Sequence, residues 1–254
     1  MGEKTSKIRL WAVIFWLVVW QLAAMGLARA YPHGSLLLAS PAAVLYRLGQ
    51  LAVTAAFWQT VGWSAARIFG GFLLSTLLAV LLAALAAWKN GVGELLAPLV
   101  AVIKAVPVAS FIILALVWLN SRSLSLFISA LMVFPPVYLN VLAGIGAADR
   151  QLLEMARVFR VPLGRRLRAI YLPAVLPYFR SAVSLALGLC WKAGAAAEVI
   201  GLPSGTIGER LYTAKVYFQT PDLFAWTAVI VAVSALFERL FLRLVDRAAE
   251  RMNV

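Results

Sequence analysis

Three charged side chains, Lys104, Lys192 and Glu198, lie inside long apolar stretches of the chain. A charge in such a stretch is costly in a bilayer, and it usually faces the interior of a helix bundle or a water-filled pathway. Two buried cations favour an anionic solute as the species that passes them. The structural alternative is that each charge pairs with a neighbouring helix or extends to the interface. Arg180, near the end of a stretch, has the same two interpretations.

A stripe of small and polar residues surrounds Lys192. Ser184 and Gly188 share a helical face with Lys192 at 3.6-residue spacing, which suits a pathway lining better than a lipid-facing surface. Glu198 lies about 120° around the helix from Lys192, so the two do not form an ion pair within the helix. Pro107 removes a backbone hydrogen bond and predicts a bend or an opening there. The predicted pathway residues are Lys104, Pro107, Ser184, Gly188, Lys192 and Glu198.

The sequence contains few of the residues and motifs that a catalytic or metal site needs. The chain has one cysteine, Cys190, and one histidine, His33, which excludes an internal disulfide and a histidine-rich metal site. A membrane enzyme would need convergent His, Asp or Glu side chains within the spans. The sequence has no G-x-x-x-x-G-K-[ST] motif, so it lacks the usual loop for nucleotide phosphates. We therefore expect no catalytic residue, no metal site and no cofactor in this chain.

The elements that position these side chains are six apolar stretches. The chain is 63% hydrophobic and only 13% charged, and about 20 apolar residues cross the hydrocarbon core as a helix. Because a backbone in lipid must satisfy its own hydrogen bonds, the sequence predicts an all-α polytopic membrane protein. The predicted spans cover residues 10–27, 68–87, 95–119, 124–142, 174–200 and 223–241. Residues 1–254 are expected to form a single transmembrane domain.

Several segments around the spans have alternatives. Basic residues precede 10–27 and a small-residue cleavage pattern follows it, but its apolar run of about 18 residues exceeds that of a signal peptide, so we expect a retained anchor. Residues 41–60 are expected to form an interfacial helix, and 201–222 an outer loop with a short helix. Within 68–87 small residues recur every four positions, which predicts close helix packing inside the chain, with a dimer interface as the alternative. This ridge consists of Gly71, Ser75, Ala79, Ala83 and Ala87.

The distribution of basic residues predicts the orientation. With the N-terminus inside, 14 of the 23 Lys and Arg residues lie in or beside the inner segments and six in the outer ones. This asymmetry follows the positive-inside rule. The net charge of +13 is therefore explained by topology, and it gives no reason to expect a nucleic-acid partner. Both termini are expected to be cytoplasmic.

The stretch EMARVFRVPLGRRLRAIYLP, residues 154–173, concentrates charge in the middle of the chain. Before Pro162, an apolar helical face including Leu152 and Phe159 opposes one on which Glu154 can pair with basic neighbours. After Pro162, Leu163, Leu167 and Ile170 form a second apolar face. Two short amphipathic helices joined by a turn are therefore expected at the cytosolic surface. They either rest on anionic lipid headgroups or dock on a soluble partner.

This stretch resembles the EAA loop of the membrane subunits of ABC importers. That pattern is E-A-A, three residues, a glycine, nine residues, then I-x-L-P. Its matching residues in this chain are Glu154, Ala156, Ile170, Leu172 and Pro173. Further segments, among them SPAAVLYRL, IKAVPVASF, FPPVYLNVLAGI and WKAGAAAEVIG, are similar in order to the nitrate/sulfonate/taurine permease subfamily across about residues 38–241.

Two positions depart from the EAA pattern. Met155 replaces the middle alanine, and Arg160 stands where the pattern has glycine. A glycine allows a tight turn that arginine resists, and we expect Gly164 to supply the flexibility instead. The resemblance implies that residues 147–173 form a cytosolic coupling loop. Its implied ATPase-coupling residues are Glu154, Ala156, Arg157, Arg160, Gly164, Ile170, Leu172 and Pro173.

The resemblance also implies the fold and the partners. The fold would be that of a type I ABC importer permease in a bacterial inner membrane. The chain would be half of a pore, completed by a second copy. Two cytosolic ATPase subunits would bind ATP and magnesium, and an extracytoplasmic solute-binding protein would deliver the solute.

The sequence therefore predicts a non-catalytic permease subunit of an ATP-driven importer for a small anionic solute, such as nitrate, a sulfonate or taurine. A vitamin precursor or another small organic solute is the alternative cargo. A membrane scaffold or sensor that transports nothing, or a membrane-embedded enzyme, is a further alternative.

Overall fold

The fold is built from helices, seen here in a computed structural model that describes residues 9–251. Among these residues there is no strand. Lys4 and Lys7, which contribute to the predicted inside charge, lie outside the described residues. In chain order the helices are α1 (Leu10–Ala30), α2 (Gly34–Leu37), α3 (Pro41–Ala52), α4 (Ala55–Trp88), α5 (Asn90–Ala105), α6 (Val108–Ala115), α7 (Ser121–Gly146), α8 (Arg150–Val158), α9 (Leu163–Arg166), a π-helical turn (Leu167–Tyr171), α10 (Leu172–Gly201), α11 (Ile207–Val216) and α12 (Thr220–Arg251).

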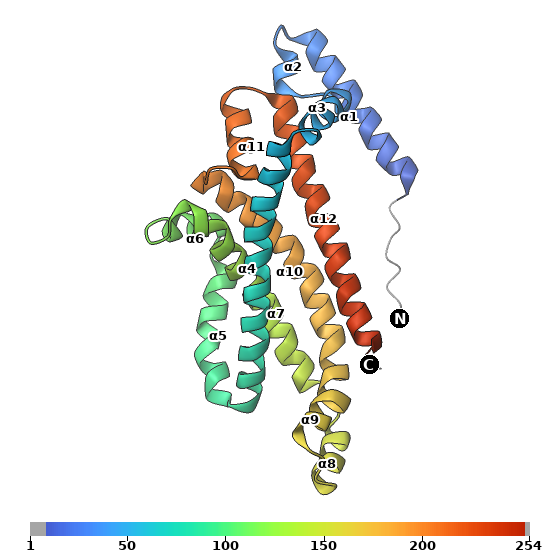
Figure 1. Ribbon diagram of the computed structural model, residues 1–254, viewed down its shortest axis with the longest axis vertical. Coiled ribbons are helices and arrows are strands. Elements are labelled where there is room, and N and C mark those ends of the chain that lie inside the picture. The colour runs from blue at the N-terminus through green and yellow to red at the C-terminus, as the bar shows by residue number, and fades with distance from the viewer. Residues whose placement is uncertain (1–8, 252–254) are drawn as a thin grey trace.

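Long apolar helices form the body of the molecule. Within the described residues, α1, α4, α7 and the continuous helix over residues 163–201 are long and apolar enough to cross a membrane. The helix α12 covers the predicted sixth span but is not among these helices. With 32 residues it would be about 48 Å long at 1.5 Å per residue. Figure 1 shows α4, α10 and α12 running lengthwise through the body, with α7 beside them, while α1 diverges from it.

The predicted span 95–119 is a broken one. Its two parts, α5 and α6, are bent by 106° relative to each other. The break lies at Val106 and Pro107, and Pro107 caps the N-terminus of α6. The bend expected at Pro107 is thereby confirmed. The physical reason is that proline cannot donate the backbone hydrogen bond that a continuous helix requires there.

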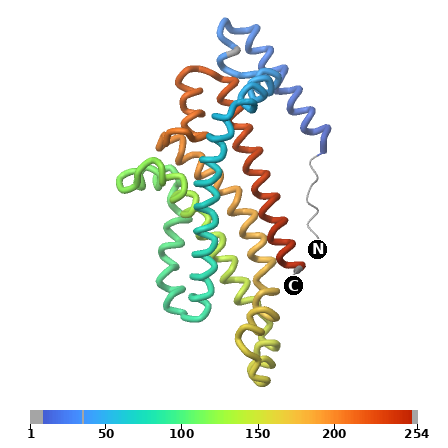
Figure 2. Tube along the Cα trace, viewed as in Figure 1, coloured from blue at the N-terminus to red at the C-terminus, as the bar shows by residue number. Residues whose placement is uncertain are grey.

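The expected interfacial helix over 41–60 is shorter than predicted. The helix α3 ends at Ala52, and α4 begins at Ala55, because the Thr54 hydroxyl accepts a hydrogen bond from the Phe57 amide at 3.3 Å and caps the new helix. Residues 55–60 thus belong to α4, which has 34 residues. Figure 2 shows the sharp change of direction between α3 and α4.

The core lies where α4, α7 and α10 meet. Four of the five ridge residues on α4 are buried, and only Ala87 is exposed. A Cβ added at Gly71 would overlap the carbonyl oxygen of Leu126 on α7, and one at Gly194 would lie 2.5 Å from the Ser129 hydroxyl. The Ser75 hydroxyl donates to the Ala130 carbonyl at 2.6 Å. The ridge therefore packs within the chain, as predicted.

In contrast, α1 has little contact with the body of the molecule. Of its 21 residues only Ala24 is buried. Trp20 packs against Phe224 of α12, with their ring centroids 5.4 Å apart. The rest of the helix is largely an exposed apolar surface, as expected for a helix whose surroundings are lipid or another protein chain.

Candidate functional site

The segment over residues 147–173 forms two short helices joined by a turn, as predicted. It lies at one end of the molecule, beyond the near ends of α5 and α12 (Figure 1). The Asp149 side chain caps α8 by accepting a hydrogen bond from the Gln151 amide at 2.8 Å. After the turn, α9 and the π-helical turn lead without a break into α10.

The turn between α8 and α9 explains the glycine of the EAA pattern. Arg160 has a φ of +50°, in the left-handed region that side chains disfavour. The Arg160 amide donates to the Arg157 carbonyl at 3.1 Å, and the Val161 amide donates to the Ala156 carbonyl at 2.9 Å. These two bonds form a Schellman motif, in which the left-handed residue is usually glycine. Arg160 therefore occupies the conformation that the pattern reserves for glycine.

Gly164 does not supply the turn, contrary to expectation. It lies within α9, and its φ is not positive. The turn is instead held by hydrogen bonds around Arg160 and by the Arg166 guanidinium, whose Nε donates to the Val161 carbonyl at 2.9 Å. The turn residue was predicted at Gly164, but the residue with the left-handed backbone is Arg160, four positions earlier.

Most apolar side chains of this segment are not packed within the chain. Ala156 is 1% exposed, whereas Phe159 is 74% exposed and Met155 50% exposed. Glu154 is also exposed. Among residues 9–251 ion pairs join only Arg47 to Asp222 and Arg180 to Asp246, so the expected pairing of Glu154 with a basic neighbour is not formed. The further exposed apolar side chains are those of Leu152, Val158, Leu163 and Leu167.

The C-terminal end of the EAA match connects this surface to the body of the molecule. Ile170 lies in the π-helical turn, while Leu172 and Pro173 begin α10. Ile170 and Leu172 are half-buried. Pro173 directly follows the π-helical turn within the continuous helix over residues 163–201, and it does not interrupt the connection. The helix therefore runs from α9 through the π-helical turn into α10 without a break.

Some of the predicted pathway residues are exposed on the single chain, and others form hydrogen bonds to neighbouring helices. Lys104 and Pro107 at the α5–α6 break are exposed, and so is Lys192 on α10, with Gly188 half-buried one turn before it. In contrast, the Ser184 hydroxyl donates to Glu238 of α12 at 2.8 Å. Arg180 likewise binds Asp246 of α12, with Nε 2.6 Å from Oδ1. Ser184 and Arg180 therefore join α10 to α12.

Glu198 is completely buried, and one of its carboxylate oxygens is hydrogen-bonded within the chain. Its Oε2 accepts hydrogen bonds from the Ser64 hydroxyl at 2.8 Å and from the Gly208 amide at 3.3 Å. The Ile207 amide donates to the same hydroxyl of Ser64 at 2.9 Å. The amides of Ile207 and Gly208 open α11, so Glu198 and Ser64 anchor the start of that helix. Sequence reasoning missed Ser64, because its only sign was one hydroxyl in a long apolar helix.

The sequence matches a known protein family over most of its length. Residues 75–253 match the sequence profile described as "Binding-protein-dependent transport system inner membrane component". The chain belongs to this family. The matched range includes residues 154–173, and the resemblance to ABC importer permeases seen in the sequence is confirmed.

Relatives extend over most of the permease. An aliphatic sulfonates transport permease protein of Bacillus subtilis, SsuC, is 28% identical over 91% of this chain and 82% of its own length. The bicarbonate transport permease CmpB of Synechococcus elongatus is 26% identical over 72% of this chain and 66% of its own. The riboflavin transport permease RibX of Chloroflexus aurantiacus is 28% identical over 89% of this chain and 86% of its own.

A solved structure supports the fold. The structure of an amino acid ABC transporter with histidines superposes with a TM-score of 0.60 at 17% sequence identity, over 80% of this chain and 97% of that one. The permease thus has the type I importer fold. It is a non-catalytic membrane subunit, and its family implies association with an ATPase and a binding protein in the inner membrane.

Proposed function

We propose that the permease forms one half of the pathway of an ATP-driven importer for a small anionic solute, with a second copy of the same chain as the other half. The relatives named for sulfonate and bicarbonate transport support an anionic cargo. The relative named for riboflavin transport makes a larger organic solute the second candidate. The N- and C-termini lie in the cytoplasm in this proposal, and ATP and magnesium bind the ATPase subunits alone.

The exposed lysines support a two-chain pathway. Lys104 and Lys192 are exposed on the single chain, although both lie within apolar stretches predicted to be at membrane depth. A lysine in contact with lipid at that depth is costly. A second copy that encloses a water-filled pathway between the two chains removes this cost and presents both cations to an anion.

The surface of α8 and α9 supports docking of a soluble ATPase. This surface combines exposed apolar side chains, such as Phe159 and Leu163, with arginines on both sides of the turn. The segment projects beyond the ends of its neighbouring helices (Figure 1), whereas a segment that rests on lipid headgroups lies along the membrane surface. We therefore assign it to the ATPase rather than to lipid, with Glu154 as the exposed acid that meets a basic partner group.

Co-purification tests this assignment. The variant Glu154→Lys reverses one exposed charge and breaks no hydrogen bond or ion pair among the described residues, so the folded permease is expected to reach the membrane in normal amount. We expect it to recover at least about tenfold less ATPase, since reversing one member of an interfacial charge pair costs several kcal/mol. Glu94→Lys, an exposed acid at the start of α5, is the matched control. Equal recovery of ATPase by the two variants would refute the docking surface.

A further inference from the structure

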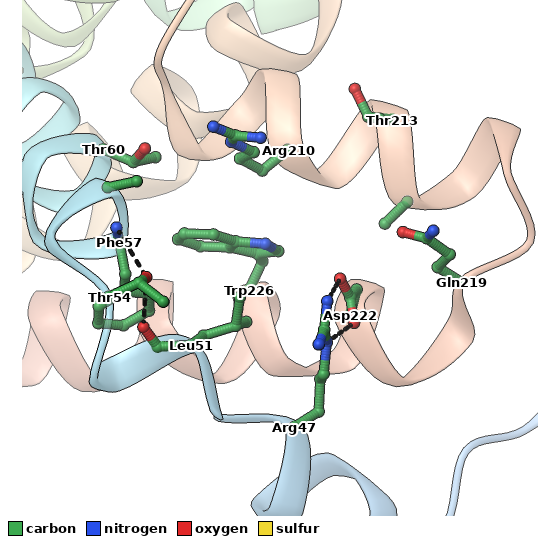
Figure 3. Close-up of a pocket in the computed structure, with 12 residues that line it drawn as sticks. Arg47, Leu51, Thr54, Phe57, Thr60, Arg210, Thr213, Gln219, Asp222 and Trp226 are labelled. Atoms are coloured by element: carbon green, nitrogen blue, oxygen red, sulfur yellow. Dashed lines mark hydrogen bonds and ion pairs between the residues drawn. The ribbon is translucent and has the colours of Figure 1, made fainter. Parts of the chain in front are cut away.

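The end of the molecule opposite α8 and α9 contains a cavity that none of the predicted pathway residues lines. Its volume is about 250 Å³, and it lies between α3, the start of α4, α11 and the start of α12. Figure 3 shows Trp226 within this cavity, with Arg210 on one side of the ring and the Arg47–Asp222 pair on another. The polar lining includes Thr60, Thr213 and Gln219.

Arg210 is the one uncompensated charge on this lining, among the residues described. Asp222, the acid that lines the cavity, is held by Arg47, with Nη2 2.9 Å from Oδ2. The hydrogen bond to Asp222 raises the pKa of Arg47, so this pair stays ionised and neutral overall. Glu209, the sequence neighbour of Arg210, accepts a hydrogen bond from the Gly205 amide at 2.6 Å and is occupied in capping. Arg210 itself has no ion pair or hydrogen bond from its side chain within residues 9–251.

The first turn of α11 fixes the backbone of Arg210, whose side chain is exposed. That turn is held by Ser64 and Glu198, and by Thr206, whose hydroxyl accepts from the Glu209 amide at 3.2 Å. Arg210 follows one turn after these anchors. A charged group on a rigid element that needs no rearrangement binds a counter-ion more tightly than one on a mobile loop.

The rest of the lining can accommodate an organic molecule. Thr60, Thr213 and Gln219 have side chains with no hydrogen bond to another described residue, so their donors are available. Leu51, Phe57 and Trp226 supply apolar surface beside them. A sulfonate or carboxylate accepts hydrogen bonds from a guanidinium in a bidentate arrangement. The small volume excludes bulky ligands.

We propose that this cavity binds a small organic monoanion, a sulfonate or a carboxylate, with its anionic group on Arg210 and its apolar part against Trp226. Each permease would then hold a solute at its outer face before the solute enters the pathway. This step rests on the proposed function, because it assumes that α3 and α11 face the side from which the solute arrives. The headgroup of an anionic lipid offers the same charge and is the competing source of the anion.

Calorimetric titration of the full-length permease in nanodiscs of zwitterionic lipid tests the proposal, with methanesulfonate as the probe. We expect saturable binding to the wild type, weakened by about tenfold or more in Arg210→Gln, because a charge-assisted hydrogen bond is lost. Arg122→Gln is the matched control, since Arg122 is exposed near the start of α7 and does not line the cavity. Both variants must elute as the wild type does in size-exclusion chromatography.

Three outcomes would overturn the proposal: no saturable binding to the wild type, equal affinities of the two variants, or loss of methanesulfonate binding when phosphatidylglycerol is added to the nanodiscs. The last would identify a lipid headgroup as the occupant. The proposed function fails separately. ATP-driven uptake by the wild-type complex without binding at this cavity would refute only the cavity, and binding without uptake would refute only the transport role.

Discussion

At one end of the permease, α11 begins on buried groups that come from α4 and α10, whereas at the opposite end α8 and α9 form a turn whose apolar and basic side chains are exposed. The Ser64 hydroxyl and the Glu198 carboxylate satisfy the first amides of α11. Among residues 9–251, the hydrogen bonds that hold the turn at Arg160 lie within residues 156–166. The start of α11 is thus held by hydrogen bonds to the core helices, whereas the α8–α9 turn is held by hydrogen bonds within its own segment.

This difference indicates different roles. A segment anchored in the core keeps its side chains in place whether or not a ligand is present, which suits a preformed cavity. A segment with exposed apolar side chains gains most of its contacts only when a partner covers it. Changes at the α11 end should therefore reduce stability, and changes at the α8–α9 end should reduce assembly and coupling.

A matched pair of glycines gives the largest expected effect on stability. A Cβ added at Gly208 would overlap Glu198 atoms, including backbone, while one added at Gly164 would meet nothing within 4 Å. Gly208→Ala should destabilise the purified permease by about 1–3 kcal/mol, because α11 must move away from α10. Gly164→Ala should be neutral or slightly stabilising, since alanine is the better helix former. Thermal unfolding in detergent measures both. If Gly164→Ala lowered the melting temperature as much as Gly208→Ala, the proposed difference in stability between the two ends would be refuted.

A smaller effect is expected at Arg160. Replacing this residue by glycine relieves a left-handed conformation that costs an L-residue about 1–2 kcal/mol, partly offset by the greater freedom of glycine in the unfolded chain. We expect Arg160→Gly to raise stability by up to about 1 kcal/mol in the same thermal measurement. A loss of stability would mean that the Arg160 side chain contributes more than its backbone strain costs.

The sequence predicted the long helices well because apolar length alone determines which segments can cross a bilayer. It also predicted the bend at Pro107, since that effect is local to the backbone. It failed at Arg160, because a Schellman turn is recognised by its glycine and this chain has none there. The pattern of the family showed the correct position, and only the backbone angle showed why.

The environment of Glu198 could not be predicted in the same way. Its partners, Ser64 and Gly208, come from α4 and α11, and only the packing of α4 against α10 brings them together. The cavity around Trp226 was missed for the same reason, since α3, α4, α11 and α12 each contribute a few ordinary residues. Periodicity within one helix carries no information about such sites.

ATP-driven uptake into proteoliposomes tests the central claim most directly, namely that the permease forms a pathway coupled to an ATPase through α8 and α9. The complex with its ATPase and binding protein would be reconstituted with wild-type permease, Glu154→Lys or Glu94→Lys, and uptake of a radiolabelled sulfonate measured with and without ATP. We expect ATP-dependent uptake with the wild type and with Glu94→Lys, and at least about tenfold slower uptake with Glu154→Lys. Uptake by Glu154→Lys at the wild-type rate would contradict the account.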